Sequence, residues 1–314
     1  MKLIESSTTI IPQDVGLEGI YKMIELAART CYKSEAFIKE GSAEKMINAL
    51  IKRGHGSPLE HGTVYLHFRY NSPINDIKYL EYTKIERFYR SNPYSKVVVR
   101  TEDHFNHDIY ITSNYRVLIE NNRLDDLQYL CDPTEYHEKR HTVRFICSRS
   151  ISHEIVRHRV MSFCQESQRY VNYSLDKFGK DITYIIPKKI KDTINDLADT
   201  YDPVEQTRRD WLVNMSLEEA ITYYGIGLDV GIMYWCESLE KDEANYMYLV
   251  NTCKWKPEEA RGVLPNDCKT DIVVTGFASD WKHFFSLRTA NGAHPDMREL
   301  ACPLEAEFKL KGFI

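Results

Sequence analysis

Residues 157–170, RHRVMSFCQESQRY, bring together side chains that could bind and polarise a small anionic molecule. Three arginines offer guanidiniums, which pair well with phosphate or carbonyl oxygens. A serine hydroxyl and amide groups could hydrogen-bond the edge of a base, and a tyrosine ring could stack on it. Because few residues of the segment are apolar, it is not an ordinary core element. A helix that ends near Arg159 and continues as a loop would present these groups at a cleft.

Two other interpretations of this segment have to be weighed. Charge clustering alone is equally consistent with a solvated, basic end of a helix. A zinc site is suggested by His153-Glu154 and His158, but zinc-protease helices carry their histidines at positions i and i+4 on one face. Here the spacing is i and i+5, which places the two side chains roughly 140° apart around a helix. We therefore predict no metal site.

Hydrophobic periodicity predicts the elements that position this segment. Apolar residues at helical spacing indicate helices at 17–32 and 43–52. Alternating or β-branched runs indicate strands at 63–70, 96–100, 141–148, 182–187 and 271–277. Strands interleaved with helices predict an α/β (α+β) class, with a central, mainly antiparallel sheet flanked by helices and a largely helical segment around 203–262.

Capping and breaking residues set the expected ends of the helices around the segment. Ser150 could cap a helix from 151 to about 158, with Ile151 and Ile155 buried. Ser279 would open a helix that Asn291-Gly292 closes. His294-Pro295 would begin a last helix, which Pro303 should kink or end.

Composition limits the class of protein. The 314 residues contain 43% hydrophobic and 28% charged residues, as in ordinary globular proteins. A net charge of -5 argues against a general nucleic-acid binder but allows a local basic pocket. We expect no membrane span, no signal peptide, and a cytoplasmic location in which the 8 scattered cysteines stay reduced. The absence of linkers or repeats predicts one domain over 1–314, with an insertion of unknown role at about 76–140.

Four separated elements give the chain a specific resemblance. The arginine–histidine–arginine group at 157–159, followed by Ser167, is the signature of flavin-dependent thymidylate synthases. GHGSPLEH (54–61) resembles the N-terminal element of that family, and ARGVLP (260–265) is similar to a second one. WKHFFSLR (281–288), followed by HPDMREL (294–300), resembles its C-terminal helix pair.

The resemblance implies an enzyme that converts dUMP to dTMP. FAD reduced by NADPH would supply the hydride, and 5,10-methylenetetrahydrofolate the methylene group, so no cysteine nucleophile is needed. Arg288 is the implied catalytic residue, because a guanidinium beside the uracil edge favours the ionised ring. The family also implies a homotetramer whose active sites draw on more than one chain.

The resemblance assigns further residues to the two ligands. The implied dUMP-binding residues are Glu154, Arg157, Gln165, Glu166, Ser167, Arg169, Arg261 and Arg288. The implied FAD-binding residues are His55, Ser57, Arg157, His158, Arg159, Gln165 and His283. An isolated histidine such as His55 would more often serve in a core or cap, but the pattern around it favours the FAD site.

Several features depart from the family or invite another interpretation. Compact members carry glutamate where this chain has Gln165, so either Gln165 or the adjacent Glu166 could contact the nucleotide. Compact members also often carry a polar Asn-Ala-Arg-like stretch where this chain has Phe277-Ala278-Ser279, so the chain departs from the family at 277–279. Cys164 is interpreted as a small buried residue. The glycine pattern GIGLDVG (225–231) falls in a helical run, so it is no dinucleotide-binding turn.

Two rival functions remain open on the sequence. The basic and aromatic side chains at 157–170 could form a nucleic-acid-binding surface. A flavoprotein of the same fold could act on another pyrimidine or have lost activity.

Overall fold

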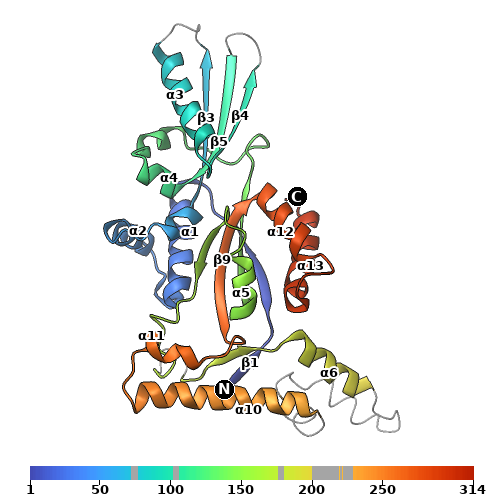
Figure 1. Cartoon of the computed structure of the whole chain (residues 1–314). Helices are drawn as coiled ribbons and strands as arrows, with labels where there is room; N and C mark the ends of the chain where they lie inside the picture. Colours follow the sequence, from blue (N-terminus) through green and yellow to red (C-terminus); the bar gives the residue numbers. More distant parts are fainter. Residues whose placement is uncertain (72–76, 102–105, 176–179, 200–218, 220, 222–228) are drawn as a thin grey trace.

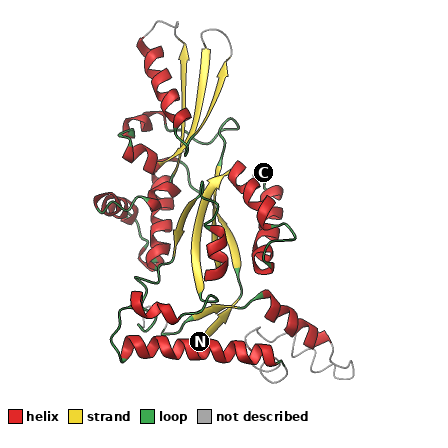
Figure 2. Ribbon diagram, viewed as in Figure 1, coloured by secondary structure: helices red, strands yellow, loops and turns green. Residues whose placement is uncertain are grey.

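The computed structural model describes residues 1–71, 77–101, 106–175, 180–199, 219, 221 and 229–314 (Figure 1). Helices flank antiparallel sheets in this part of the chain, so the predicted α+β class is confirmed (Figure 2). No helix among the described residues is long and apolar enough to cross a membrane. The same residues include no group of three histidine, cysteine, aspartate or glutamate side chains placed to hold a metal ion.

A four-stranded antiparallel sheet forms the centre of the molecule. Its strands in spatial order are β2 (Ser7–Ile11), β6 (Arg140–Ser148), β9 (Lys269–Phe277) and β7 (Ser162–Gln165). The short strand β7 lies at one edge and pairs only with β9 among the described strands, with Gln165 opposite Ile272. This pairing places the 157–170 segment at the edge of the sheet, where its side chains can extend to either face.

The two faces of this sheet carry different helices. α5 (Arg149–Ile155), α12 (Ala278–Arg288) and α13 (Pro295–Leu310) share a core with Ile272 and Val274. α1 (Gly16–Tyr32) lies on the opposite face, where Val273 packs with Ala27 and Cys164. Successive residues of a strand point to opposite faces, which explains this division. Figure 1 shows α1 and α13 on opposite sides of β9.

A second antiparallel sheet shares a core with α1, in which Ile20 and Ile24 pack with Val64. It consists of β3 (Thr63–Asn71), β5 (Asn106–Asn114) and β4 (Lys96–Thr101), in that order. The helical elements around it are α2 (Ser42–Lys52), η2 (Ser57–His61), α3 (Ile77–Ser91), α4 (Tyr115–Glu120) and η3 (Leu124–Tyr129). Much of the region predicted as an insertion, 76–140, therefore folds as the outer part of this sheet and its helices.

The remaining elements lie at the other end of the central sheet. β1 (Lys2–Ile4) and β8 (Thr183–Ile185) form a parallel pair. Nearby elements are η1 (Glu35–Phe37), α6 (Lys188–Asp199), α10 (Val230–Asn251), α11 (Pro257–Ala260) and η6 (Arg261–Val263). Within the predicted helical segment 203–262, residues from 229 onward are mainly helical, and residues 203–218, 220 and 222–228 lie outside the described residues.

The helix before the Arg157 segment differs from its prediction in both ends. α5 starts at Arg149, and the hydroxyl of Ser148 rather than that of Ser150 caps it by accepting from the Ile151 N–H at 3.3 Å. The helix ends at Ile155, and residues 162–165, expected in a loop, pair with β9 as β7. The sequence did not reveal this strand, because its four residues lack an alternating apolar pattern and its stability comes from pairing with a buried neighbour.

The start of α12 is also earlier than predicted. The helix begins at Ala278, so Ser279 lies inside it and does not open it. The carboxylate of Asp280 accepts from the Phe277 N–H at 3.0 Å and supplies the cap. Because β9 continues to Phe277, the chain passes directly from strand to helix at this point.

Pro303 does not end the last helix, which continues through it to Leu310. A proline inside a helix removes one backbone hydrogen bond and costs about 3 kcal/mol. Leu300, Leu304 and Phe308 are buried on the central sheet. Burial of such side chains stabilises by about 1.5–3 kcal/mol each, which offsets the cost.

Candidate active site

Arg288, at the C-terminal end of α12, is held by three hydrogen bonds to α5 and the residues after it. Its Nη1 donates to Glu154 Oε2 at 2.6 Å, and its Nη2 donates to the Glu154 carbonyl at 2.7 Å. Its Nε donates to His158 Nε2 at 3.1 Å. The sequence places these residues 130 or more positions apart, and the packing of α5 and α12 on one sheet face brings them together.

His158 is the buried member of this cluster, with 6% of its surface exposed. Burial, together with the nearby Arg288 and His283, lowers its pKa to about 4. The imidazole is therefore neutral at pH 7, so its Nε2 can accept the hydrogen bond from Arg288. The ring of His283 lies 5.8 Å from that of His158, in an edge-on arrangement.

An open cavity of about 770 Å³ adjoins this cluster. It is lined by Glu154, Val156, Arg157, Arg159, Leu287 and Arg288. The side chains of Arg157 and Arg159 are exposed, and no hydrogen bond or ion pair joins them to another described residue. Four of the predicted site residues thus line one cavity that offers uncompensated positive charge.

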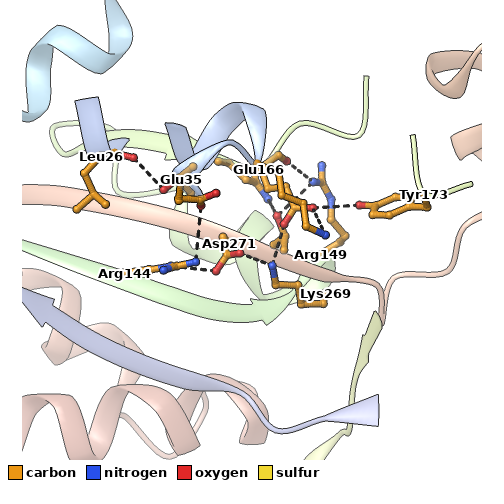
Figure 3. A network of polar contacts seen from close by, with 12 residues as sticks. Leu26, Glu35, Arg144, Arg149, Glu166, Tyr173, Lys269 and Asp271 are labelled. Atoms are coloured by element: carbon orange, nitrogen blue, oxygen red, sulfur yellow. Dashed lines mark hydrogen bonds and ion pairs between the residues drawn. The ribbon is translucent and has the colours of Figure 1, made fainter. Parts of the chain in front are cut away.

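Gln165 and Glu166 point to opposite faces of the central sheet. Gln165 lies on the α5 face, where its amide donates to the hydroxyls of Ser152 at 2.8 Å and Thr270 at 3.2 Å. Glu166 is 2% exposed on the α1 face, where Lys269 Nζ donates to its Oε2 at 2.9 Å (Figure 3). Of the two, only Gln165 is on the same face as the Arg288 cluster.

The N-terminal candidates His55 and Ser57 lie on the α1 face, away from Arg288. Both are exposed, and His55 Nδ1 is 3.2 Å from the hydroxyl of Tyr32, the last residue of α1. The Tyr32 ring in turn lies 5.5 Å from that of Tyr170. Within one chain, the central sheet separates these residues from the cavity lined by Arg157 and Arg159.

The loop after β7 places Ser167 and Arg169 at the edge of the central sheet that β7 forms. The Ser167 N–H donates to the carbonyl of Cys31 at 3.0 Å, which ties the loop to the end of α1. Arg169 is exposed and lies 3.8 Å from Glu258 in α11. Arg261 follows directly after α11 and is also exposed. Arg169 is therefore close to α11, and Arg261 lies at the end of the same short helix.

A family model described as "Thymidylate synthase complementing protein" matches residues 17–73 and 137–311. The chain belongs to this family. The matched residues contain all four sequence elements on which the resemblance rested, which is thereby confirmed. The family model leaves 74–136 unmatched, a stretch that holds α3, β4, β5, α4 and η3.

Relatives from this family are named "Flavin-dependent thymidylate synthase". The protein of Pyrococcus furiosus is 30% identical over 155 residues, which are 49% of this chain and 48% of the relative. That of Clostridium tetani is 32% identical over 162 residues, 52% and 55% of the two chains. That of Corynebacterium aurimucosum is 34% identical over 154 residues, 49% and 51%. The chain thus spans about half the length of the relatives it matches.

Sequence reasoning missed the residues that hold Gln165 and Glu166 in place. Lys269 and Asp271 hold Glu166 and its neighbours, Tyr173 contacts the Glu166 carboxylate, and Ser152 receives Gln165. One signal was available in KTDIVV, where a lysine and an aspartate occupy alternate positions at the start of a strand. Charges that point toward a covered face of a sheet need partners there.

Proposed function

We propose that the chain is a flavin-dependent thymidylate synthase that converts dUMP to dTMP. In this reaction 5,10-methylenetetrahydrofolate gives the methylene group, and FAD reduced by NADPH gives the hydride. The single observation that carries the proposal is the fixed guanidinium of Arg288 at a cavity with two further unpaired arginines. Family membership supports the same reaction.

Arg288 is suited to polarise a uracil ring. A guanidinium has five N–H donors, of which three are used by Glu154 and His158, so two remain for a ligand. A donor that is already oriented stabilises developing negative charge without reorganising. Its role would be to favour the ionised N3–C=O edge of dUMP, which makes the uracil C5 a better nucleophile.

The residues around the cavity fit a flavin cofactor as well as a nucleotide. Arg157, Arg159 and the exposed His283 supply cationic and planar groups of the kind that bind phosphates and stack on rings. Bound flavin would supply the hydride chemistry. Cys164 is unsuited to attack uracil, because it is 1% exposed and its pKa is raised by the neighbouring Cys31 thiol and by burial.

We further propose that complete sites form between copies of the chain. His55 and Ser57 lie on the α1 face, whereas Arg157, Arg159 and His283 lie on the α5 face. An FAD site that includes both sets requires the α1 face of one chain to meet the α5 face of another. A homotetramer with shared sites would satisfy this requirement, and a cytoplasmic location remains part of the proposal.

Release of tritium from [5-³H]dUMP tests substrate and reaction together. The purified chain, supplied with FAD, NADPH and methylenetetrahydrofolate, should release tritium, and omission of any one of the three should abolish the release. A sample loaded with flavin that releases none would refute the proposed activity. Release from a labelled pyrimidine other than dUMP, without release from dUMP, would favour the same-fold flavoprotein instead.

A further inference from the structure

The candidate nucleotide loop is fastened to the sheet by a buried group of charges on the α1 face. Glu166, the residue between the last residue of β7 and Ser167, directs its carboxylate away from the Arg288 cluster. Its Oε2 accepts from Lys269 Nζ at 2.9 Å, and its Oε1 accepts from the Tyr173 hydroxyl at 3.4 Å. The side chains of Glu166 and Lys269 are only 2% and 13% exposed.

The backbone of Glu166 is held as firmly as its side chain. Its N–H donates to the carbonyl of Asp271 at 2.8 Å, and its carbonyl accepts from Arg149 Nη1 at 3.2 Å. The next residue, Ser167, donates its N–H to Cys31. Figure 3 shows Glu166 surrounded by Arg149, Lys269 and Tyr173. Residue 166 is thus a fixed point from which the loop with Ser167 and Arg169 departs.

Lys269 is the centre of this group because it serves two carboxylates. Its ammonium donates to Glu166 and also to Asp271, whose other oxygen accepts from Arg144 Nε at 3.1 Å. Burial acts to lower the pKa of Lys269, but attraction to Glu166 and Asp271 outweighs it and raises the pKa. Without the ammonium, two buried carboxylates would lose the cation between them and keep only their outer partners, Lys33 at 3.8 Å from Glu166 and Arg144 at 3.1 Å from Asp271, which is unfavourable.

Resting on the proposed function, we infer that Lys269 is a positioning residue for the dUMP-binding loop. By pairing with the inward carboxylate of Glu166, it fixes the loop so that Ser167 and Arg169 can meet the nucleotide. The two neighbouring residues would then have different roles: Glu166 anchors the loop, and Gln165 remains on the substrate face.

The test compares Lys269→Met with two matched variants. Lys269→Arg keeps a cation that can pair with both carboxylates. Lys309→Met removes a lysine whose ion pair with Glu305 is exposed, with 62% of the lysine side chain in contact with solvent. For Lys269→Met we expect KM for dUMP to rise about tenfold and kcat to change less than about threefold, the pattern of lost binding contacts. Lys269→Arg should recover most of the loss, and Lys309→Met should behave as wild type.

Hydrogen exchange in the chain without ligands gives a readout that does not depend on turnover. In Lys269→Met, peptides that cover residues 164–171 should exchange faster, while peptides of β6 and the centre of β9 should not change. If Lys269→Met folds poorly, Glu166→Gln combined with Lys269→Met removes both partners, and it should fold better than the single variant. Even in that double variant the loop should exchange faster than in wild type.

Three results would overturn the inference. These are unchanged exchange at 164–171, faster exchange spread evenly over the whole sheet, and an unchanged KM for dUMP in Lys269→Met. A wild-type chain that releases no tritium refutes the proposed function instead. Wild-type turnover with an unaltered Lys269→Met variant refutes the positioning role alone.

Discussion

Two cation–carboxylate groups lie on opposite faces of the same sheet and differ in whether they leave hydrogen-bond donors unused. The Arg288–Glu154 pair borders an open cavity, with 17% and 32% of the side chains exposed, and Arg288 keeps two spare donors. The Lys269–Glu166 pair is buried, and Asp271 and Tyr173 occupy its remaining positions. In the proposed function, similar residue types would therefore serve a ligand on one face and the chain itself on the other. Spare hydrogen-bonding capacity, more than charge, distinguishes a binding group from a structural one.

Substitution of Arg288 should give the largest effect and the clearest contrast between the two faces. Arg288→Ala removes the polarising group, so we expect kcat to fall at least about a hundredfold. Glu154, left without its partner, is one-third exposed and can be hydrated, so the free energy of unfolding should change by less than about 1 kcal/mol. Steady-state kinetics and urea unfolding would measure the two quantities. Turnover equal to wild type would contradict the catalytic role.

Glu154 tests whether the orientation of Arg288 matters as well as its presence. Glu154→Ala removes one charge-assisted hydrogen bond at 2.6 Å but leaves the bonds to the residue 154 carbonyl and to His158. We expect kcat to fall about tenfold, the loss associated with one such bond. Glu154→Gln keeps an acceptor oxygen and should recover most of the activity. If the two variants are equally impaired, the negative charge rather than the hydrogen bond is what Arg288 needs.

Acid should weaken the fold through histidines that are buried in neutral form. Burial lowers the pKa of His61 to about 3, with Arg140 adding to the effect, and burial lowers those of His141 and His158 to about 4. The ordinary value is 6.5, so between pH 6.5 and about 4 the unfolded chain binds more protons than the folded one. Stability should therefore fall as the pH falls through this window, by up to about 1.4 kcal/mol per pH unit for each histidine.

Urea unfolding at pH 7, 6 and 5 would measure this dependence. His158→Gln should make it shallower, because one of the titrating groups is gone. A free energy of unfolding that stays constant from pH 7 to 5 would show that these histidines are not neutral in the folded chain.

Elements with a strong internal pattern were predictable from the sequence. The spacing in 17–32 and 43–52 predicted α1 and α2, and alternation in 63–70 predicted β3. Strand β7 was not predictable, because Ser162–Gln165 is short, lacks an alternating apolar pattern and owes its conformation to β9. The continuation of α13 through Pro303 was missed for a related reason, since burial on the sheet outweighs the local preference of proline.

The candidate site was predictable in its members but not in its geometry. Sequence elements indicated Arg157, Arg159 and Arg288, and the structure places all three at one cavity. The choice between Gln165 and Glu166 could not be made from the sequence, because it depends on Lys269, which lies 103 positions from Glu166. The binding roles of these residues remain predictions.

His55 and Arg288 lie on opposite faces of the sheet. This arrangement affects how the rate of product formation would depend on the amount of the protein in a cell. If one complete site needs residues from two or more chains, the number of sites depends on association and not only on synthesis. At low concentration that number grows with at least the square of the chain concentration, since association obeys mass action. Halving the amount of protein would then remove more than half of the complete sites, and a modest rise in the amount would add a disproportionately large number of them. The sheet that separates the two sets of residues would in this way make the supply of product sensitive to dosage.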